Sequence, residues 1–352
     1  MGPLKIEEPP TLPPTTEPEP TETTADPDAL AYQEAEALLA EGKLGEAAIA
    51  FGKLAGYSDA RDRSLAIWEK IAVRDTISTY YNHTVGLRVD GTVIATGLNE
   101  NGQCDLNGWT DIIAVSAGGF HTLGLRSDNT VVAHGFRSNG RCDVDDWTDI
   151  VAVSAGFTFS LGLKIDGTVV ATGINESGQC NVEDWTDIVA INANGDYTLG
   201  LKADGTVVST GINDFGACDV GDWTDIMAIS THGHTIGLKP DGTAVAVGYN
   251  NGVPGGRCDV ANWSELKAVR TGSFFTVGLK ADGSVILTGN LGYGRGDASY
   301  WSDIVAIAAG EDHIVGLRPD GKVWTAGRNN HGCCNVSSWK DILVREKPVP
   351  FR

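Results

Sequence analysis

The chain of 352 residues lacks the short motifs that usually mark catalysis, metal binding or a membrane span. It has no Gly-x-Ser-x-Gly, His-Glu-x-x-His or phosphate-binding loop, so nothing supplies a hydrolytic or phosphoryl-transfer centre. It has no Asp-x-Asp-x-Asp-Gly loop for calcium and no Cys-x-x-Cys pair for zinc. No apolar run approaches the ~20 residues of a membrane helix or forms a signal peptide. We therefore expect a non-enzymatic protein with no catalytic residues, no metal and no cofactor.

Basic residues are also scarce. The chain has 26 Lys and Arg against 46 Asp and Glu, which gives a formal net charge of −20, and no cluster of basic residues stands out. Phosphate backbones and anionic lipid surfaces are bound by clustered Lys and Arg. The composition therefore argues against nucleic acid as a partner and against direct membrane insertion.

What the chain does have is a repeat. Seven tryptophans recur at intervals of 38 residues, with one interval of 40: Trp109, Trp147, Trp185, Trp223, Trp263, Trp301 and Trp339. A fixed period of this size predicts an array of identical supersecondary units, none of which buries its apolar face alone. Such arrays bind partners far more often than they catalyse reactions.

One repeat, residues 147–184, shows the fold of the unit. Three runs rich in Val, Ile and Thr (150–155, 159–164 and 168–173) predict strands, and the segment around 178–182 predicts a short fourth strand. Asp166-Gly167 separates the second and third runs and predicts a tight antiparallel hairpin. Seven such units without a helical return segment predict a mainly β, seven-bladed propeller over residues 74–345. The last segment, 341–344, repeats the opening strand, so we expect it to close the ring beside the first blade.

Three residue types recur at fixed positions of the repeat. A glycine lies inside each second strand, as at Gly86 and Gly124, which predicts close approach of another backbone near the axis. Six cysteines share one position and are expected to be small buried thiols, because equivalent atoms on neighbouring blades lie too far apart for disulfides. His83, His121, His234 and His313 share another position, where other copies have Phe or Tyr, so packing is favoured over metal binding.

These pieces resemble the regulator-of-chromosome-condensation repeat family, a class of seven-bladed propellers. The resemblance rests on Ala117-Gly118, His121-Thr122 and Gly124-Leu125, then Asp-Gly-Thr-Val, then Gly-x-Asn-x-x-Gly-Gln as at 97–103, and it covers roughly residues 75–345. The compact repeat is more similar to bacterial members, among them a secreted inhibitor of β-lactamases. The family also includes nucleotide-exchange factors and ubiquitin ligase parts, so the fold alone does not assign a function.

The region before the repeats has two parts. Residues 1–28 hold eight of the thirteen prolines and are otherwise rich in Thr and Glu, which predicts a disordered stalk. Residues 29–73 are rich in Ala, Leu and Glu with helical spacing, and the first two predicted helices resemble a tetratricopeptide hairpin. One hairpin is too small for a peptide groove, so packing on the propeller is the favoured role. Residues 346–352 form a short tail.

The residues that vary between copies point to a binding face. The loop before each second strand changes from blade to blade, and variable loops on one side of a regular array usually form its binding surface. The candidate residues are Tyr81, Phe120, Phe157, Asp196, His232, Phe274 and Asp312. Aromatic rings are frequent in binding hot spots, although these rings could instead pack under neighbouring loops.

The hypothesis is a monomeric binding or scaffold propeller, secreted from or displayed on a bacterial cell, with a protein or glycan ligand. The alternatives are an inhibitor of an extracellular enzyme, similar to the β-lactamase inhibitor, and a nucleotide-exchange regulator. The near-uniform repeats show no wedge insertion for nucleotide exchange. A cytoplasmic location is the alternative to an extracellular one.

Overall fold

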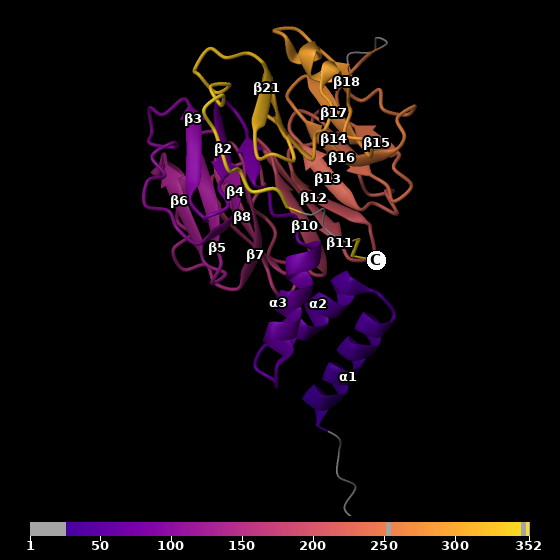
Figure 1. The fold of residues 1–352 in the computed structure, drawn as a ribbon. Coiled ribbons are helices and arrows are strands. Elements are labelled where there is room, and N and C mark those ends of the chain that lie inside the picture. Colours follow the sequence, from indigo (N-terminus) through magenta and orange to yellow (C-terminus); the bar gives the residue numbers. More distant parts are fainter. Residues whose placement is uncertain (1–25, 251–254, 346–349, 352) are drawn as a thin grey trace, which may run out of the picture.

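The computed structural model describes residues 26–250, 255–345 and 350–351. Seven antiparallel sheets of three strands each form a ring, and three helices pack beneath it (Figure 1). Within every sheet the strands are joined in chain order, so each repeat is one blade. The expected seven-bladed propeller is confirmed. Residues 1–25, most of the predicted stalk, lie outside the described residues.

The blades follow one another along the chain. Blades 1 to 3 contain β1 (Ile77–Thr79), β2 (His83–Leu87), β3 (Val93–Gly97), β4 (Ile112–Ala117), β5 (His121–Arg126), β6 (Val131–Gly135), β7 (Ile150–Ala155), β8 (Phe159–Lys164) and β9 (Val169–Gly173). Blades 4 and 5 contain β10 (Ile188–Ala193), β11 (Tyr197–Lys202), β12 (Val207–Gly211), β13 (Ala228–Thr231), β14 (Thr235–Leu238) and β15 (Ala244–Val247). Blades 6 and 7 contain β16 (Leu266–Thr271), β17 (Phe275–Lys280), β18 (Val285–Gly289), β19 (Ala306–Ala309), β20 (His313–Leu317) and β21 (Val323–Gly327). Two 3-10 helices, η1 (Ser138–Gly140) and η2 (Arg295–Tyr300), follow β6 and β18.

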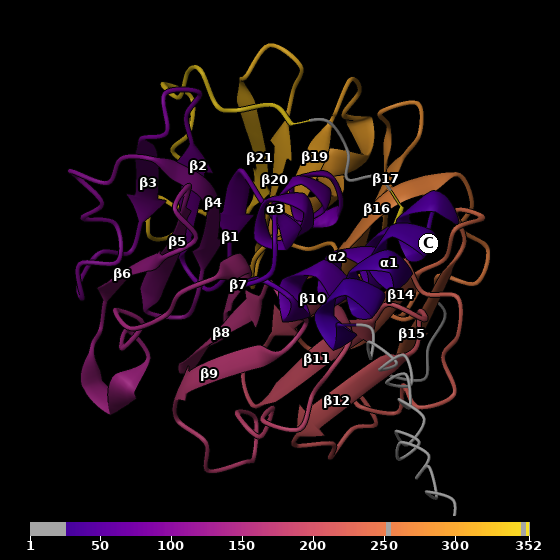
Figure 2. The same ribbon diagram turned by 90° about the horizontal axis from the view of Figure 1, so that it is seen from below.

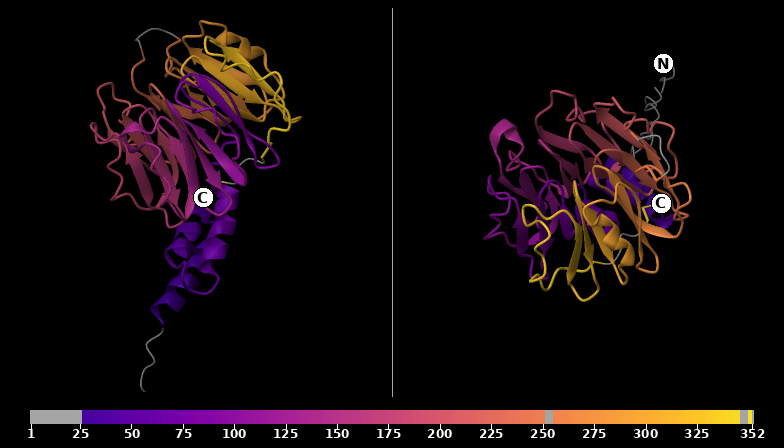
Figure 3. Two further views of the ribbon diagram at one scale, coloured as in Figure 1. Left: turned by 90° about the vertical axis from the view of Figure 1, so that its left-hand side faces the viewer. Right: turned by 90° about the horizontal axis from the view of Figure 1, so that it is seen from above.

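The first strand of every blade lies at the centre of the ring. Each of these strands contacts the first strands of the two neighbouring blades, and β1 of blade 1 contacts β19 of blade 7. The ring is therefore closed around a central channel (Figure 3). We call the side with the loops between first and second strands the upper face, and the side with the second-to-third turns the lower face.

The tight turns lie where the sequence predicts them. Gly91, Gly167 and Gly205 have φ between 76° and 79°, the left-handed region that glycine tolerates. In blade 2 the corresponding residue is Asn129 with φ 67°, and its side-chain amide donates to the carbonyl of Ile150 at 2.9 Å. Asparagine thus replaces glycine there at little steric cost.

The prediction of a fourth strand in each repeat is wrong. In the described residues, the segment after each third strand forms turns instead of a ladder. In the first copy Asn99 Oδ1 accepts from the Cys104 amide at 2.8 Å, which folds the segment back on itself. The carbonyl of Gln103 then accepts from Thr122 Oγ1 of blade 2 at 2.8 Å. The segment links adjacent blades, and its polar groups are used there rather than in a fourth strand.

The glycine inside each second strand has a different cause from the expected backbone contact at the axis. A Cβ added at Gly124 would lie 2.7 Å from the ring of Trp109, and Gly200 faces Trp185 in the same way. The recurring tryptophan therefore occupies the place where a side chain on the second strand would be. Close backbone approach occurs instead at the end of the third strand: a Cβ at Gly135 would lie 2.4 Å from the carbonyl oxygen of Phe120.

Closure of the ring uses both ends of the array, as the sequence predicts. Ile342 forms an antiparallel bridge with Arg88, and the Leu343 amide donates to the carbonyl of Leu87 at 2.8 Å. Because β1 pairs only with the other end of β2, from Thr84 to Gly86, the opening strand of blade 1 is built from two separate segments. Ile342 is buried at 1% exposure.

The helical segment packs on the lower face. Helices α1 (Pro27–Ala40), α2 (Leu44–Lys53) and α3 (Ala60–Ile71) lie below the ring (Figure 2). The helical region begins slightly before the predicted boundary, because Asp26 caps α1 and Pro27 fits its first turn. Trp68 of α3 is fully buried and its Nε1 donates to the Ile165 carbonyl at 2.9 Å. The helices therefore pack directly on the ring.

The C-terminal residues also anchor the helices. Phe351 is buried, and its carbonyl accepts from the Gly45 amide at the start of α2 at 2.8 Å. A Cβ added at Gly45 would lie 3.0 Å from Val189 and 3.4 Å from Phe351, so α2, the tail and blade 4 meet closely there. The helices, the ring and the described end of the chain therefore form one packed unit.

Candidate functional site

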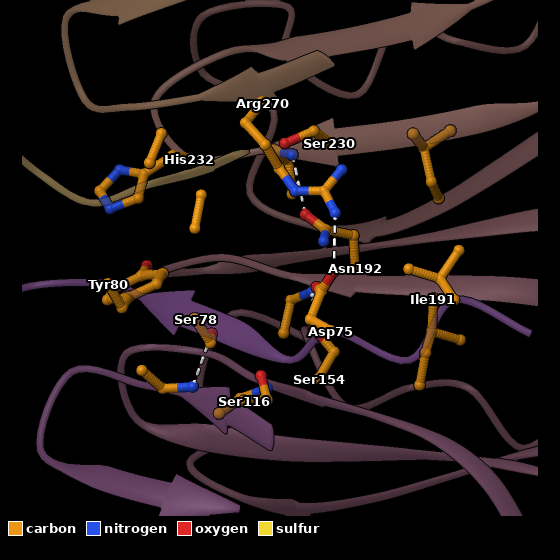
Figure 4. Close-up of a pocket in the computed structure, with 18 of the residues that line it drawn as sticks. Asp75, Ser78, Tyr80, Ser116, Ser154, Ile191, Asn192, Ser230, His232 and Arg270 are labelled. Atoms are coloured by element: carbon orange, nitrogen blue, oxygen red, sulfur yellow. Dashed lines mark hydrogen bonds and ion pairs between the residues drawn. The ribbon is translucent and has the colours of Figure 1, made fainter. Parts of the chain in front are cut away.

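The wall of the central channel holds one side chain from each first strand at the same level. These residues are Ser78, Ser116, Ser154, Asn192, Ser230, Arg270 and Ala308. Ser116 Oγ accepts from the Ala155 amide of the next blade at 2.9 Å, and four further junctions have the same bond (Figure 4). These polar side chains are thus used to join neighbouring blades, and we assign them a structural role.

The channel is blocked at its upper end. Tyr80, from blade 1, reaches across to blade 4, where its hydroxyl donates to Asn194 Oδ1 at 3.1 Å. Its ring stacks on the His232 ring of blade 5 with centroids 4.5 Å apart. Tyr80 is buried, and the remaining space in the channel is only about 110 Å³. The channel is therefore a poor binding site.

An aromatic cluster lies above this plug on the upper face. Tyr81, Phe120 and Phe157 come from the corresponding loops of blades 1, 2 and 3. Their ring centroids lie 5.0 to 5.7 Å apart in edge-to-face pairs. Such pairs are stabilised beyond their area burial by about 0.5–1.5 kcal/mol. All three rings remain partly exposed, so each packs against its neighbours and also contributes to the protein surface.

Beside the cluster is a hollow of about 550 Å³, which opens on the upper face. Tyr81 and Phe157 line it from the loops before β2 and β8, and Ile212 and Phe215 line it from the loop after β12. Phe215 is 69% exposed and stacks on Tyr249, which is 52% exposed, with centroids 5.7 Å apart. Aromatic rings from three blades therefore line the hollow.

The rim of the hollow is mainly acidic. It carries Asp196, Asp214 and Glu311 against one cation, Arg257. Burial, and next the neighbouring Asp312 carboxylate, raise the pKa of Glu311 above its usual value. The Arg257 guanidinium bonds to the carbonyl oxygens of Tyr249 and Ser273, so it lies along the wall. The hollow thus has a negative rim and aromatic walls.

Four of the seven predicted binding residues line this hollow: Tyr81, Phe157, Asp196 and His232. Phe120 supports them through its contact with Phe157. His232 lies at the floor, where its Nδ1 bonds to Ser273 Oγ at 3.0 Å, and burial lowers its pKa to about 4. It is thus neutral at pH 7.

The other two predicted residues lie apart from the hollow. Phe274 is 52% exposed but is not part of the wall. Asp312 forms ion pairs with the buried Arg295 and, at 3.4 Å, with Arg328. Its carboxylate is therefore already paired with arginines of the same chain.

Four segments of the chain match the family model of the regulator of chromosome condensation (RCC1) repeat. They cover residues 75–103, 112–141, 150–179 and 304–333, each of which includes the second strand and the turn segment of a blade. The chain carries RCC1 repeats.

Solved propellers share this arrangement at low sequence identity. The ectodomain of the receptor kinase ACR4 from Arabidopsis thaliana is 18% identical with a TM-score of 0.59, over 73% of this chain and 96% of that one. The ectodomain of the receptor kinase CR4 from Physcomitrella patens is 18% identical with a TM-score of 0.57, over 72% and 73%. Prp20p from Saccharomyces cerevisiae is 17% identical with a TM-score of 0.52, over 67% and 80%. These likenesses show the fold.

No curated protein sequence matches the chain. Among the described residues, no helix has the length and apolar character needed to cross a membrane. The same residues contain no group of three or more His, Cys, Asp or Glu side chains placed to hold a metal ion.

The histidines of the RCC1 repeats join blades. His121 Nε2 lies 2.8 Å from Ser160 Oγ of the next blade, and that hydroxyl donates to the Arg141 carbonyl at 2.7 Å. The serine hydrogen is thus used, so the histidine is the donor and its proton is on Nε2. His83 and His313 make the same bond to Thr122 and Thr84, each at 3.0 Å.

Sequence reasoning missed several residues of the hollow, above all Phe215, Asp214 and Arg257. Its candidate residues all came from the loops before the second strands. A signal was present: the third strand runs antiparallel to the second, so the loop that follows it must reach the same face. Phe215, four residues after the end of β12 at Gly211, could have been placed on the upper face in this way.

Proposed function

We propose that this chain is a non-enzymatic binding protein whose upper face receives a basic segment of a partner protein. The observation that carries the proposal is the hollow of about 550 Å³ with aromatic walls and an acidic rim. Exposed aromatic side chains that gather in one patch often mark a binding site, whereas single exposed rings are common on any surface. Here two such rings, Phe215 and Tyr249, stand beside the cluster of Tyr81, Phe120 and Phe157.

The chemistry of the hollow favours a cationic group. A Lys or Arg side chain over the face of Tyr81 or Phe157 gains about 0.5–2 kcal/mol from the ring quadrupole. Asp196 and Glu311, both on the rim, would add charge-assisted hydrogen bonds. The excess of acidic residues over the whole chain would also attract a basic partner from a distance.

A protein partner is favoured over a glycan by this rim. Aromatic walls can hold a sugar ring, and carboxylates can accept hydrogen bonds from its hydroxyls, but a neutral sugar gains no charge–charge attraction from three carboxylates beside one arginine. Among similar folds, Prp20p is characterised by its binding to Gsp1p and histones. That likeness supports a protein-binding role for the propeller and leaves the partner of this chain to be identified.

Site-specific photo-crosslinking tests the proposal. A p-benzoylphenylalanine residue replaces Phe215 on the upper face or, as the matched control, Val89, which is 64% exposed in the lower-face turn after β2. A specific partner should crosslink from position 215 and not from 89. The purified partner should then bind the Phe157→Ala and Asp196→Asn variants at least tenfold more weakly. Equal crosslinking from both positions, or unchanged binding by both variants, would show that the hollow is not the binding site.

The second candidate function is inhibition of an extracellular enzyme. The upper face would then cover an active site instead of holding a peptide. Assays of class A β-lactamases with micromolar protein test this form directly, and full hydrolysis at that concentration removes those enzymes from consideration.

We also propose that the protein acts outside a bacterial cell, held at a distance by the Pro/Thr/Glu-rich residues 1–28. Its cysteines are compatible with an oxidising exterior: all seven are free thiols, and burial raises the pKa of Cys142 and Cys180 to about 11. Such thiols stay protonated and react slowly. Labelling of intact cells with an antibody to the propeller tests the location, and labelling only after lysis would favour the cytoplasm.

A further inference from the structure

A second cavity, of about 350 Å³, lies on the lower face between the helices and the mouth of the channel. It is separate from the hollow of the upper face and does not depend on the function proposed above. Its floor is the inner ends of several blades, and its lid is the segment from Glu69 to Ile77, which connects α3 to β1. Ligand pockets in proteins typically have ~300–1,000 Å³, so this cavity is within that range.

The charges around this cavity are opposite in sign to those of the chain. Five cationic residues line it: Lys70, Arg74, Lys267, Arg270 and Arg345. Of the acidic residues that the structure describes, only Glu69 and Asp75 do so, in a chain with a net charge of −20. Asp75 is already paired with Arg270 at 2.8 Å (Figure 4). Among the described residues, an excess of positive charge therefore remains.

Three of these cations are bound by main-chain carbonyls and form no ion pair with a described residue. Arg345 NH2 donates to Ile113 O at 2.9 Å, Arg74 Nε to Val151 O at 3.3 Å, and Lys267 Nζ to Ile304 O at 3.3 Å. Ile113 and Val151 lie at the irregularities of register where β4 and β7 begin, which leaves their carbonyls free of the ladder. Each cation thus keeps further N–H donors.

Arg74 and Arg345 lie close enough to repel each other. Burial, and next the charge of Arg345, lower the pKa of Arg74 to about 10 against an opposing effect of the Glu69 carboxylate, so Arg74 stays charged at neutral pH. The Nε of Arg345 is buried and has no hydrogen-bond partner among the described residues. An anion between the two guanidiniums would satisfy these donors and remove the repulsion.

The remaining walls are apolar. They include Ile71, Val189, Met227, Leu238, Val305 and Phe351. A free inorganic ion would leave these surfaces wet, whereas a hydrocarbon body would cover them. We propose that this cavity binds a small organic anion with an apolar body, such as a medium-chain carboxylate, with its charged head between Arg74 and Arg345. A bound ligand would contact both the helices and the ring, and would stabilise their packing.

Calorimetric titration of the full chain with octanoate tests this assignment. Octanol, which lacks the charge, and inorganic phosphate, which lacks the apolar body, are the comparison ligands. Octanoate should bind at least tenfold more tightly than either and should raise the melting temperature. Equal binding of octanol removes the anion site, and equal binding of phosphate removes the apolar part of the proposal.

Variants locate the site. Arg74→Met and Arg345→Met should each weaken octanoate at least tenfold, whereas Arg137→Met, at an exposed position of the upper face, should not. Met227→Trp keeps every cation and fills the cavity, so it should also lose octanoate, and circular dichroism checks that each variant is folded. Unchanged binding by Met227→Trp, or by the folded arginine variants, overturns the proposal. Binding that appears only in Glu69→Gln also overturns it, because Glu69, which lines the cavity and acts on both guanidiniums, would then be their partner.

Discussion

Trp339, near the end of the array, packs against Gly86 in the first blade. A Cβ at Gly86 would lie 2.7 Å from the Trp339 ring, the same relationship that Trp109 has with Gly124 inside the array. Trp339 therefore packs into blade 1 in the way that Trp109 packs into blade 2. Residues more than 250 positions apart thus complete blade 1. The contact continues into Ile342, whose side chain would lie 2.9 Å from the same Cβ.

Removal of this closing segment should destabilise the whole ring. We expect deletion of residues 340–352 to lower the melting temperature by about 5 °C or more and to promote aggregation, because Arg88 and Leu87 lose their partners at an exposed edge. Deletion of 346–352 is the control, since it keeps Ile342 and Leu343 and, among the described residues, removes Pro350 and Phe351. Calorimetry and size-exclusion chromatography measure both effects. A monomeric 340–352 deletion that melts like the parent would contradict closure by this strand.

The glycine in the second strand should be intolerant of any side chain. Gly124→Ala places a methyl group 2.7 Å from the ring of Trp109, and the surrounding strands leave little room for the ring to move. Overpacking of this kind costs on the order of 1–3 kcal/mol of unfolding free energy. Gly221→Ala is the matched control, because no heavy atom lies within 4 Å of its added Cβ. Urea denaturation distinguishes the two, and similar costs for both variants would rule out this role of the tryptophan.

The fold could be predicted because its signals are local. The Asp-Gly turns depend on residues adjacent in the sequence, and the tryptophans recur at an interval that can be read directly from it. Together with the repeated opening segment at 341–344, these signals predicted the hairpins, the blades and the closure. The role of Gly86 could not be predicted in the same way. Its partner, Trp339, is distant in the chain, and only the packed structure shows that an indole ring rather than a backbone lies against it.

The site was predicted in part for a similar reason. Tyr81, Phe157 and Asp196 could be placed on one face because their loops occupy the same position of each repeat. The contact of Tyr80 with Asn194, 114 residues away, depends on how far a side chain reaches across the ring. The ion pairs of Asp312 likewise depend on Arg295 and Arg328 from other loops. Such contacts form only because the closed ring brings distant loops together, so they leave no periodic pattern in the sequence.

Truncation within a blade should depend strongly on position. Leu125 lies in β5 and is fully buried, so Leu125→Ala should lower the free energy of unfolding by about 2–5 kcal/mol. Leu98, in the loop after β3, is only partly buried, and Leu98→Ala should cost much less. The change in side chain is the same in both variants, so the difference reports the packing alone. Equal costs in chemical denaturation would mean that the strand assignment is wrong.

Acid should destabilise the protein before its carboxylates titrate. Burial lowers the pKa of His121 to about 3 and that of His313 to about 4, whereas an unfolded histidine titrates near ~6.5. The unfolded chain therefore takes up protons first, and the stability provided by each neutral histidine is complete above pH ~6.5 and is lost as the pH falls towards its folded pKa.

The size of this effect can be measured one histidine at a time. Between pH 7 and pH 5.5, each buried histidine should remove about 1 kcal/mol of unfolding free energy. His121→Phe, which introduces the residue that blade 3 has at the same position (Phe159), should lose that share of the pH dependence. His331→Phe is the control, because His331 is exposed. Urea denaturation at both pH values gives the slopes. If His121→Phe keeps the full slope, then His121 is not held neutral in the folded ring, and its bond to Ser160 does not persist as the structure shows it.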